Sequence, residues 1–280
     1  MSAEFIDSTV RNQIADKLKE AFFHYYRYQP PPAEVTSWRN SLRAMAQILD
    51  RSRLTEHGVL LEYQLPLSSK RLDCLVCGRD RSNDDNAVIV ELKQWERCAE
   101  ADPDKLVSTW IGGRERPTLH PSVQVGQYLQ YLQDTHTAFY EGDSPVRLSG
   151  CAYLHNYSAQ ATDPLRAGKF SDAIVAYPFF DGDATDLLSD FLVNRLAGGV
   201  GRPVLDRVEQ SGYRPSRKLM DYVADTVKTH SPWVLLDEQL VVFESILSAV
   251  RSGLFGKRKQ VVLVRGGPQR SVRNWVARIY

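Results

Sequence analysis

The sequence predicts an α/β protein, in which a mixed central β-sheet is flanked by helices and followed by a mainly helical C-terminal region. Three observations indicate this class. Apolar residues recur at helical spacing near the N-terminus, three strand-like runs follow, and helical spacing then returns before two further strand-like runs. This order is typical of a sheet covered by helices.

Two helices are expected before the first strand. Residues 8–27 show helical spacing, and the prolines after Gln29 interrupt them, since proline cannot continue a helix. The second helix is expected over residues 32–49. Its apolar face would be formed by Trp38, Leu42, Met45 and Leu49.

Three strands are expected next. Residues 59–65 alternate, with Val59, Leu61 and Tyr63 on one face and Glu62 on the other. Residues 71–77 and 87–93 have high β propensity, and the polar stretch 78–86 joins them as a hairpin loop.

The rest of the chain is expected to hold a helix over 120–134 with Pro121 in its first turn, and strands over 149–157 and 172–180. Further on, the pattern predicts helices over 184–196, 216–228 and 237–252, and a strand over 260–265. We expect a first domain over residues 1–182 and a second region over 183–280.

Composition excludes few functions. The formal net charge of +1 neither supports nor excludes a nucleic-acid partner, because phosphate binding depends on where the charges lie. The four cysteines, Cys74, Cys77, Cys98 and Cys151, are too few for a disulfide scaffold. Cys74 and Cys77 form a CxxC inside an apolar strand, with no second pair to complete a zinc site.

The N-terminus lacks a basic start followed by an apolar stretch, and no apolar run is long enough to span a bilayer. A cytoplasmic location without membrane association is therefore expected.

The residues with the clearest chemical meaning lie on the second and third strands. Glu91 and Lys93 are two apart on a strand, so they project from the same face, while Val88, Val90 and Leu92 take the other. Pairing of 71–77 with 87–93 brings Asp73 near Glu91. Two carboxylates at close range repel each other, and a divalent cation relieves that repulsion.

Magnesium suits such a site, since it binds a few carboxylates and keeps several waters. The metal would polarise a phosphodiester and lower the pKa of a bound water, and Lys93 would orient that water. The alternative is that Asp73 and Glu91 are exposed strand residues paired with Arg71 and Lys93.

The following helix contains Gln124 and Tyr128, four apart on one helical face. With these residues, the chain resembles the PD-(D/E)XK nuclease superfamily, particularly its RecB-like branch. That branch has an acidic residue on one strand, (D/E)xK on the next and QxxxY on a helix. Asp73, Glu91-Leu92-Lys93 and Gln124 with Tyr128 match in order and spacing.

The resemblance implies that Asp73, Glu91 and the backbone carbonyl of Leu92 bind Mg²⁺, with Mn²⁺ as a substitute. It implies Lys93 as the catalytic lysine, and Gln124 and Tyr128 as residues that contact DNA or steady the site. The alternative for this pair is a helix that covers the sheet with a half-buried tyrosine.

Four other residues are weighed with the site. Glu62 is a candidate third catalytic carboxylate, with Glu34 on the second helix as its rival, and either can be a surface glutamate instead. Trp95 is expected to be a core or edge aromatic residue. His120, at the start of the QxxxY helix, either contacts phosphate at the helix N-terminus or caps the helix.

Residues 233–268 resemble the start of a superfamily 1 helicase-type ATPase. Leu236-Asp237-Glu238-Gln239 resembles a Q-motif, and the apolar run before Gly266-Gly267-Pro268 resembles the approach to a Walker A loop. The GK[ST] that would hold phosphate and magnesium is absent from the sequence, so no ATPase activity and no functional ATP-binding residues are expected.

The chain as a whole resembles the N-terminal nuclease domain of bacterial nuclease–helicase proteins of the Schlafen-like or superfamily 1 type, with the helicase part truncated. The resemblance implies a metal-dependent deoxyribonuclease that acts in anti-phage defence or DNA repair. The alternative is a catalytically inactive nucleic-acid-binding or scaffold module. Residues 184–280 would then dock a partner protein or a second copy.

Overall fold

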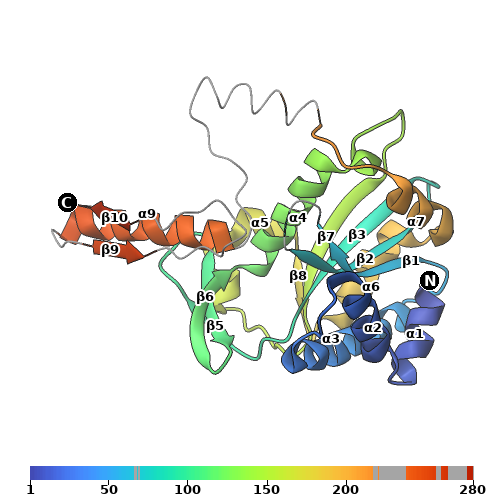
Figure 1. The fold of residues 1–280 in the computed structure, drawn as a ribbon, viewed down its shortest axis with the longest axis horizontal. Coiled ribbons are helices and arrows are strands. Elements are labelled where there is room, and N and C mark those ends of the chain that lie inside the picture. Colours follow the sequence, from blue (N-terminus) through green and yellow to red (C-terminus); the bar gives the residue numbers. More distant parts are fainter. Residues whose placement is uncertain are drawn as a thin grey trace.

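A five-stranded mixed sheet forms the centre of the molecule (Figure 1). The computed structural model describes residues 1–65, 68, 70–216, 220, 238–256, 260–263 and 276–279. The strand order is β1-β2-β3-β7-β8, in which β1, β2 and β3 are antiparallel and β3, β7 and β8 are parallel. The strands are β1 (Gly58–Gln64), β2 (Arg71–Arg79), β3 (Asp85–Lys93), β7 (Arg147–Leu154) and β8 (Phe179–Asp181). The expected α/β class with a mixed sheet is confirmed.

Helices cover both faces of this sheet. One face packs against the helices α1 (Ser2–Val10), α2 (Ile14–Tyr26), α3 (Pro32–Arg51) and α6 (Thr185–Leu196). The other face packs against α4 (Pro121–Thr135) and α7 (Gly201–Gln210). The result is the helix–sheet–helix arrangement of Figure 1, with one apolar core on each face of the sheet.

Alternation along the central strands supplies both cores. Val88 and Val90 of β3 point to the core beneath α3, and Ile89 points to the core beneath α4. The expected apolar face of the second helix is buried: Trp38, Leu42, Met45 and Leu49 are at most 4% exposed. Burial of such side chains stabilises a fold by about 1.5–3 kcal/mol each.

The N-terminal segment differs from the expected single helix over residues 8–27. It forms α1 and α2, which are separated at Asn12, a residue in the left-handed backbone region with φ 57°. Asparagine tolerates this conformation better than most residues, so the chain can turn there. The prediction of one continuous helix was wrong.

Between β3 and α4 the chain forms a three-stranded antiparallel sheet that the sequence analysis did not anticipate. It consists of β4 (Cys98–Glu100), β5 (Leu106–Ile111) and β6 (Arg114–Leu119). Gly112 and Gly113, both with positive φ, turn the chain between β5 and β6. Figure 1 shows this hairpin to one side of the central sheet.

The segment 172–180, expected as a strand, is mostly helical. Helix α5 (Ser171–Ala176) precedes the short strand β8. Ile174 packs on the core while Val175 is exposed, and a run this short cannot be assigned by periodicity alone. Two 3-10 turns, over 164–166 and 168–170, precede α5, and a third covers 137–139.

Helices α6 and α7, which follow residue 182, contact the central sheet. Leu188, Leu192 and Leu196 of α6 are buried on one face, and Val204 and Val208 of α7 on the other. The domain division at residue 182 stays a prediction. Beyond α7, the described elements are α9 (Glu238–Gly256), β9 (Gln260–Leu263) and β10 (Val276–Ile279). Most of the expected helix over 216–228, Leu236-Asp237 and Gly266-Gly267-Pro268 lie outside the described residues.

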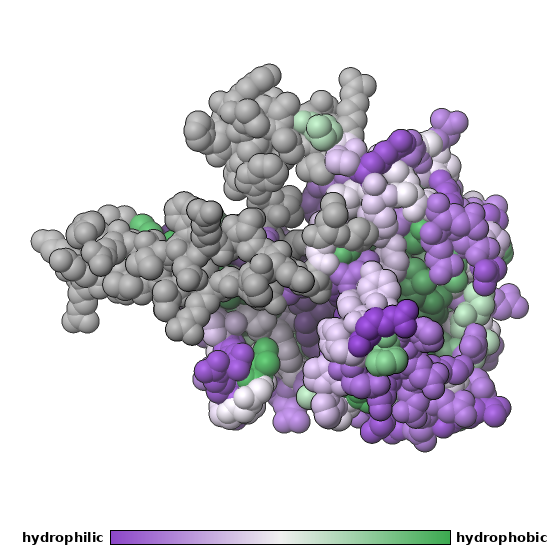
Figure 2. Space-filling view, in the orientation of Figure 1, coloured by the Kyte–Doolittle hydropathy of each residue, from purple (hydrophilic) through white to green (hydrophobic). Residues whose placement is uncertain are grey.

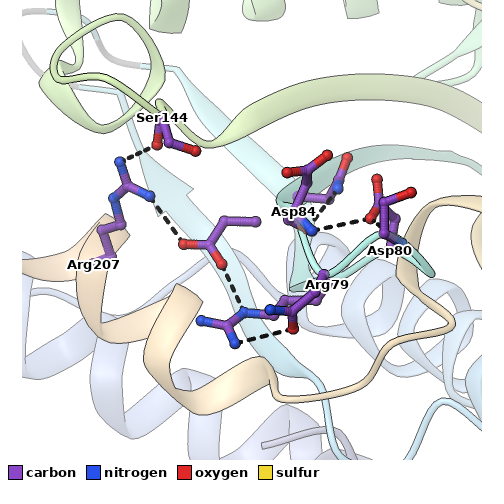
Figure 3. Close-up of polar contacts among 9 residues, drawn as sticks. Arg79, Asp80, Asp84, Ser144 and Arg207 are labelled. Carbon is purple, nitrogen blue, oxygen red and sulfur yellow. Dashed lines mark hydrogen bonds and ion pairs between the residues drawn. The ribbon is translucent and has the colours of Figure 1, made fainter.

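Charged residues close the turn between β2 and β3. Asp85 accepts a hydrogen bond from Arg79 at 2.8 Å and another from Arg207 of α7 at 2.9 Å (Figure 3). Asp80 accepts from the backbone N–H groups of Ser82 and Asp84 within the turn. These bonds fix this end of the hairpin to α7 and leave the opposite end for the chemistry described below.

The surface in the view of Figure 2 is mostly hydrophilic over the described residues, with separate hydrophobic patches. None of the described helices combines the length and apolar character that a membrane crossing requires.

Candidate metal centre

The ladder between β2 and β3 ends at the pair Cys74 and Val90. One residue further along, Asp73 directs its side chain to the neighbouring strand, and its Oδ2 accepts a hydrogen bond from the Leu92 backbone N–H at 2.7 Å. The carboxylate therefore takes the place of a backbone partner where the strands separate. This contact brings Asp73 beside the Glu91-Leu92-Lys93 segment, as the sequence predicted.

Glu91 and Lys93 face each other on β3. The Lys93 Nζ lies 2.9 Å from Glu91 Oε1, and their side chains are 16% and 4% exposed, respectively. The same ammonium lies 5.8 Å from the centre of the Trp95 ring. Because both charges are largely removed from water, each depends on nearby polar groups. Trp95 itself is buried in the core beneath α4, as expected.

Glu62 interrupts the alternation of β1. It has φ 52°, in the left-handed region, so the residues on either side of it do not keep one pattern. Val59 and Leu61 pack beneath α3, whereas Tyr63 packs on the other face with Leu60. The expectation that Tyr63 shares a face with Val59 and Leu61 was wrong, because the local backbone turns the strand at Glu62.

Arg71 connects the two candidate third carboxylates. Its guanidinium forms an ion pair with Glu34 of α3, and its Nε lies 3.4 Å from Glu62 Oε2. Arg71 also lies over the ring of Phe22 at 5.3 Å. From the sequence, Arg71 was expected only as an alternative partner for a strand acid. Because Arg71 lies two residues before Asp73 on the same strand, the sequence could have indicated that it lies near the candidate site.

The electrostatics of this cluster are unusual. Burial first, and then the nearby Glu62, raise the pKa of Asp73 to about 7, although Lys93 and the Leu92 N–H act in the opposite direction. Burial also raises the pKa of Glu62 to about 7, against the lowering effect of Arg71. Two acids whose charge is costly at neutral pH are characteristic of functional sites, and they favour a bound cation.

The QxxxY pair is formed within α4. Gln124 Nε2 donates a hydrogen bond to the Tyr128 hydroxyl at 2.8 Å. Tyr128 is 2% exposed and belongs to the core beneath α4, whereas Gln124 is partly exposed. Tyr128 is therefore placed to hold Gln124 and the sheet in position, and Gln124 is the member of the pair that solvent can reach.

His120 caps α4. Its Nδ1 accepts a hydrogen bond from the Ser122 N–H at 3.1 Å, and its Nε2 lies 3.0 Å from the Leu165 carbonyl oxygen. Its side chain is fully buried against Phe170, so it cannot reach a phosphate in solvent. The capping interpretation is confirmed, and the phosphate contact was wrong.

All four cysteines are free thiols. Cys74, Cys77 and Cys151 are buried thiols, and Cys98 is partly exposed on β4. Burial raises the pKa of the Cys77 thiol to about 12, so it stays protonated and unreactive at neutral pH.

The fit to a divalent cation depends on the pair Asp73 and Glu91. Within the part of the chain that the structure describes, no group of three or more His, Cys, Asp or Glu side chains is arranged to hold a metal. Glu62 therefore does not complete a three-carboxylate set with the pair. Two carboxylates, a backbone carbonyl and water are nevertheless an ordinary oxygen ligand set for Mg²⁺.

The Leu92 carbonyl fits this set. In a strand that exchanges both bonds with one partner, the N–H and C=O of a residue point to the same side. Since the Leu92 N–H points to Asp73, its carbonyl also faces the gap between β2 and β3. The Oδ1 atom of Asp73 can coordinate there while Oδ2 keeps the Leu92 amide.

Comparisons with models of protein families, with curated proteins and with solved structures find no match to this chain. The geometry of the site therefore carries the functional argument by itself.

Proposed function

We propose that this protein is a Mg²⁺-dependent nuclease of the PD-(D/E)XK type that hydrolyses phosphodiester bonds in DNA, with Mn²⁺ able to replace Mg²⁺. One observation carries the proposal. Asp73 is tied to the Leu92 amide at the point where two strands separate, next to a buried pair of Glu91 and Lys93. A structural strand pair needs none of these charges, and their burial is costly.

The residues divide the reaction between them. Asp73, Glu91 and the Leu92 carbonyl would hold the cation, which when bound neutralises the phosphate and lowers the pKa of a coordinated water. Lys93, in contact with Glu91, would orient the attacking water and offset the charge of the pentavalent transition state. Gln124 would contact the substrate, with Tyr128 fixing its position.

The test is degradation of supercoiled and linear plasmid in Mg²⁺ or Mn²⁺, with EDTA as the metal-free control. We expect Asp73→Asn and Lys93→Ala each to lower the rate by about 100-fold or more. The matched controls Asp102→Asn and Lys19→Ala change exposed residues of the same types and should cut as the wild type does. Equal cutting by all five proteins would contradict the proposal.

One observation favours a second candidate, an inactive nucleic-acid-binding or scaffold module. Glu91 is paired with Lys93, and Glu62 with Arg71, so the cluster already contains cations of its own. Such a protein would bind DNA in the plasmid assay without cutting it. If residues 184–280 dock a partner protein or a second copy of the chain, removal of the segment after residue 216 should abolish that binding.

A further inference from the structure

Exposed tyrosines gather where α2 ends. Tyr25 is 70% exposed and Tyr28 is 56% exposed, which is unusual for two aromatic side chains so close in sequence. Each packs against a less exposed aromatic residue, the half-buried Tyr26 or the buried Phe22. Tyr25 packs edge-on against Tyr26 with ring centres 4.7 Å apart, and Tyr28 packs edge-on against Phe22 at 5.2 Å. We call Tyr25 and Tyr28 the aromatic shelf.

The aromatic shelf adjoins the candidate metal centre. The Tyr26 hydroxyl donates a hydrogen bond to Gln64, the last residue of β1, so the end of α2 lies against that end of the sheet (Figure 1). The Arg71 guanidinium lies 6.0 Å from the Tyr26 ring and pairs with Glu62 on its other side. Glu62 lies opposite Asp73 in the β1–β2 ladder, between the pairs Leu61–Cys74 and Tyr63–Leu72. A set of contacts thus leads from Tyr25 through Tyr26 and Arg71 to Glu62, which is the strand neighbour of Asp73.

The charge of the segment suits a polyanion. Residues 21–33 contain no aspartate or glutamate, and they place His24 and Arg27 among the tyrosines, both exposed. Arg27 has φ 63°, so it ends α2 and turns the chain between the two shelf residues. A positive charge beside aromatic rings, here that of Arg27, is a common means of holding a nucleic-acid backbone while its bases stack.

We infer that Tyr25 and Tyr28 stack against the bases of a single-stranded nucleic acid and deliver that strand to the candidate metal centre. Base faces are covered in a duplex and open only in a single strand or a frayed end, so the shelf selects unpaired substrate. This inference rests on the proposed function for its purpose, because it names the substrate form that the same site would cut.

The experiment measures the binding of fluorescently labelled oligo(dT) by anisotropy in EDTA, so that no cutting occurs. We expect the double variant Tyr25→Ala and Tyr28→Ala to raise Kd about tenfold or more, since each stacked base contributes about 1–3 kcal/mol. The corresponding pair of Tyr→Phe changes keeps both ring faces and should bind as the wild type does. Trp110→Ala, which removes an exposed aromatic residue from the separate three-stranded sheet, is the matched control.

Selective loss of oligo(dT) binding in the alanine double variant supports the inference. The inference is overturned if Kd is unchanged in that variant or if Trp110→Ala loses binding to the same extent. It is also overturned if a duplex binds as tightly as oligo(dT) and loses binding equally when the tyrosines are replaced. The plasmid assay separates the two proposals. If oligo(dT) binding depends on the tyrosines but no metal-dependent cutting occurs, the shelf is supported and the nuclease proposal is rejected. If the protein cuts but the alanine variant keeps its Kd, the nuclease is supported and the shelf is rejected.

Discussion

Asp73 has two roles that conflict energetically. Its carboxylate replaces a strand partner for the Leu92 N–H, which stabilises the fold, yet its burial beside Glu62 makes the charge costly at neutral pH. A residue selected only for stability would be neutral here. The conflict is the kind that active sites maintain for the sake of chemistry.

Asp73→Asn should therefore stabilise the metal-free protein while abolishing cutting. The asparagine Oδ1 still accepts from Leu92, but no charge is buried. The acid has a folded-state pKa of about 7, above its ordinary value, so its destabilising effect develops as pH rises from about 4 to 7. We expect a gain of about 1 kcal/mol or more at pH 8, vanishing below pH ~4.

Urea unfolding at both pH values, in EDTA, measures this gain. Asp102→Asn serves as the control for a change of net charge, since Asp102 is exposed. A variant that is less stable than the wild type at pH 8 would mean that the Asp73 charge is favourable in the metal-free fold.

For His120 we predict the opposite pH dependence, in which the free energy of unfolding falls as the pH falls. Burial lowers its pKa to about 4, and the nearby Lys169 lowers it too, although the Leu165 carbonyl acts against this. The unfolded chain therefore takes up a proton near pH 6.5 that the folded chain excludes. Because of this residue, the free energy of unfolding should fall by about 2 kcal/mol as the pH falls from 7 to 5.

His120→Asn keeps an N-cap and removes the titration. We expect the variant to lose less stability between pH 7 and pH 5 than the wild type does, whatever its stability at pH 7. Thermal unfolding followed by circular dichroism gives the comparison. Parallel pH profiles for the two proteins would show that His120 does not titrate abnormally.

At the scale of elements, α7 depends on one close approach. A Cβ placed on Gly201 would lie 2.1 Å from the Gly58 backbone N and 2.3 Å from the His57 Cα. Glycine is therefore required for the start of α7 to pack on the start of β1. Gly201→Ala should lower the unfolding free energy by about 3 kcal/mol or more, as overpacking against backbone does.

Gly168→Ala is the matched control, because nothing lies within 4 Å of a Cβ placed there. Both variants are measured by urea unfolding. Equal stability of the two would show that α7 can move away from β1 without cost, which would contradict the packing described for this end of the sheet.

The elements that the sequence predicted well have long, regular patterns. Helix α3 shows its buried face at helical spacing, and β3 carries an unbroken run of high β propensity. Strand β6 was not found because the Arg114–Leu119 stretch has no alternation of apolar residues. Helix α7 was missed although Val204, Leu205 and Val208 give a helical signal after the glycines.

At the scale of the whole molecule, the two ends of the β2–β3 hairpin have different tasks. The turn end is held to α7 through Asp85 and Arg207, whereas the other end separates around Asp73 and Glu91. A rigid hairpin fixed at one end can hold two acids at a constant distance at the other.

The sequence indicated the members of the candidate site but could not place all of them. Asp73, Glu91 and Lys93 follow from strand parity and hairpin pairing, which are local rules. Glu62 depends on a backbone angle that no pattern encodes, and the bridge from Arg71 to Glu34 joins a strand to a helix 37 residues away. Contacts of that kind arise from packing, so sequence periodicity does not reveal them.

The central claim, that Asp73 and Glu91 hold one divalent cation, is tested most directly by Mn²⁺ binding measured by calorimetry at pH 8 in the absence of nucleic acid. We predict one Mn²⁺ site in the wild type that is lost in both Asp73→Asn and Glu91→Gln and kept in Asp102→Asn. Equal Mn²⁺ affinity in all four proteins would contradict the account.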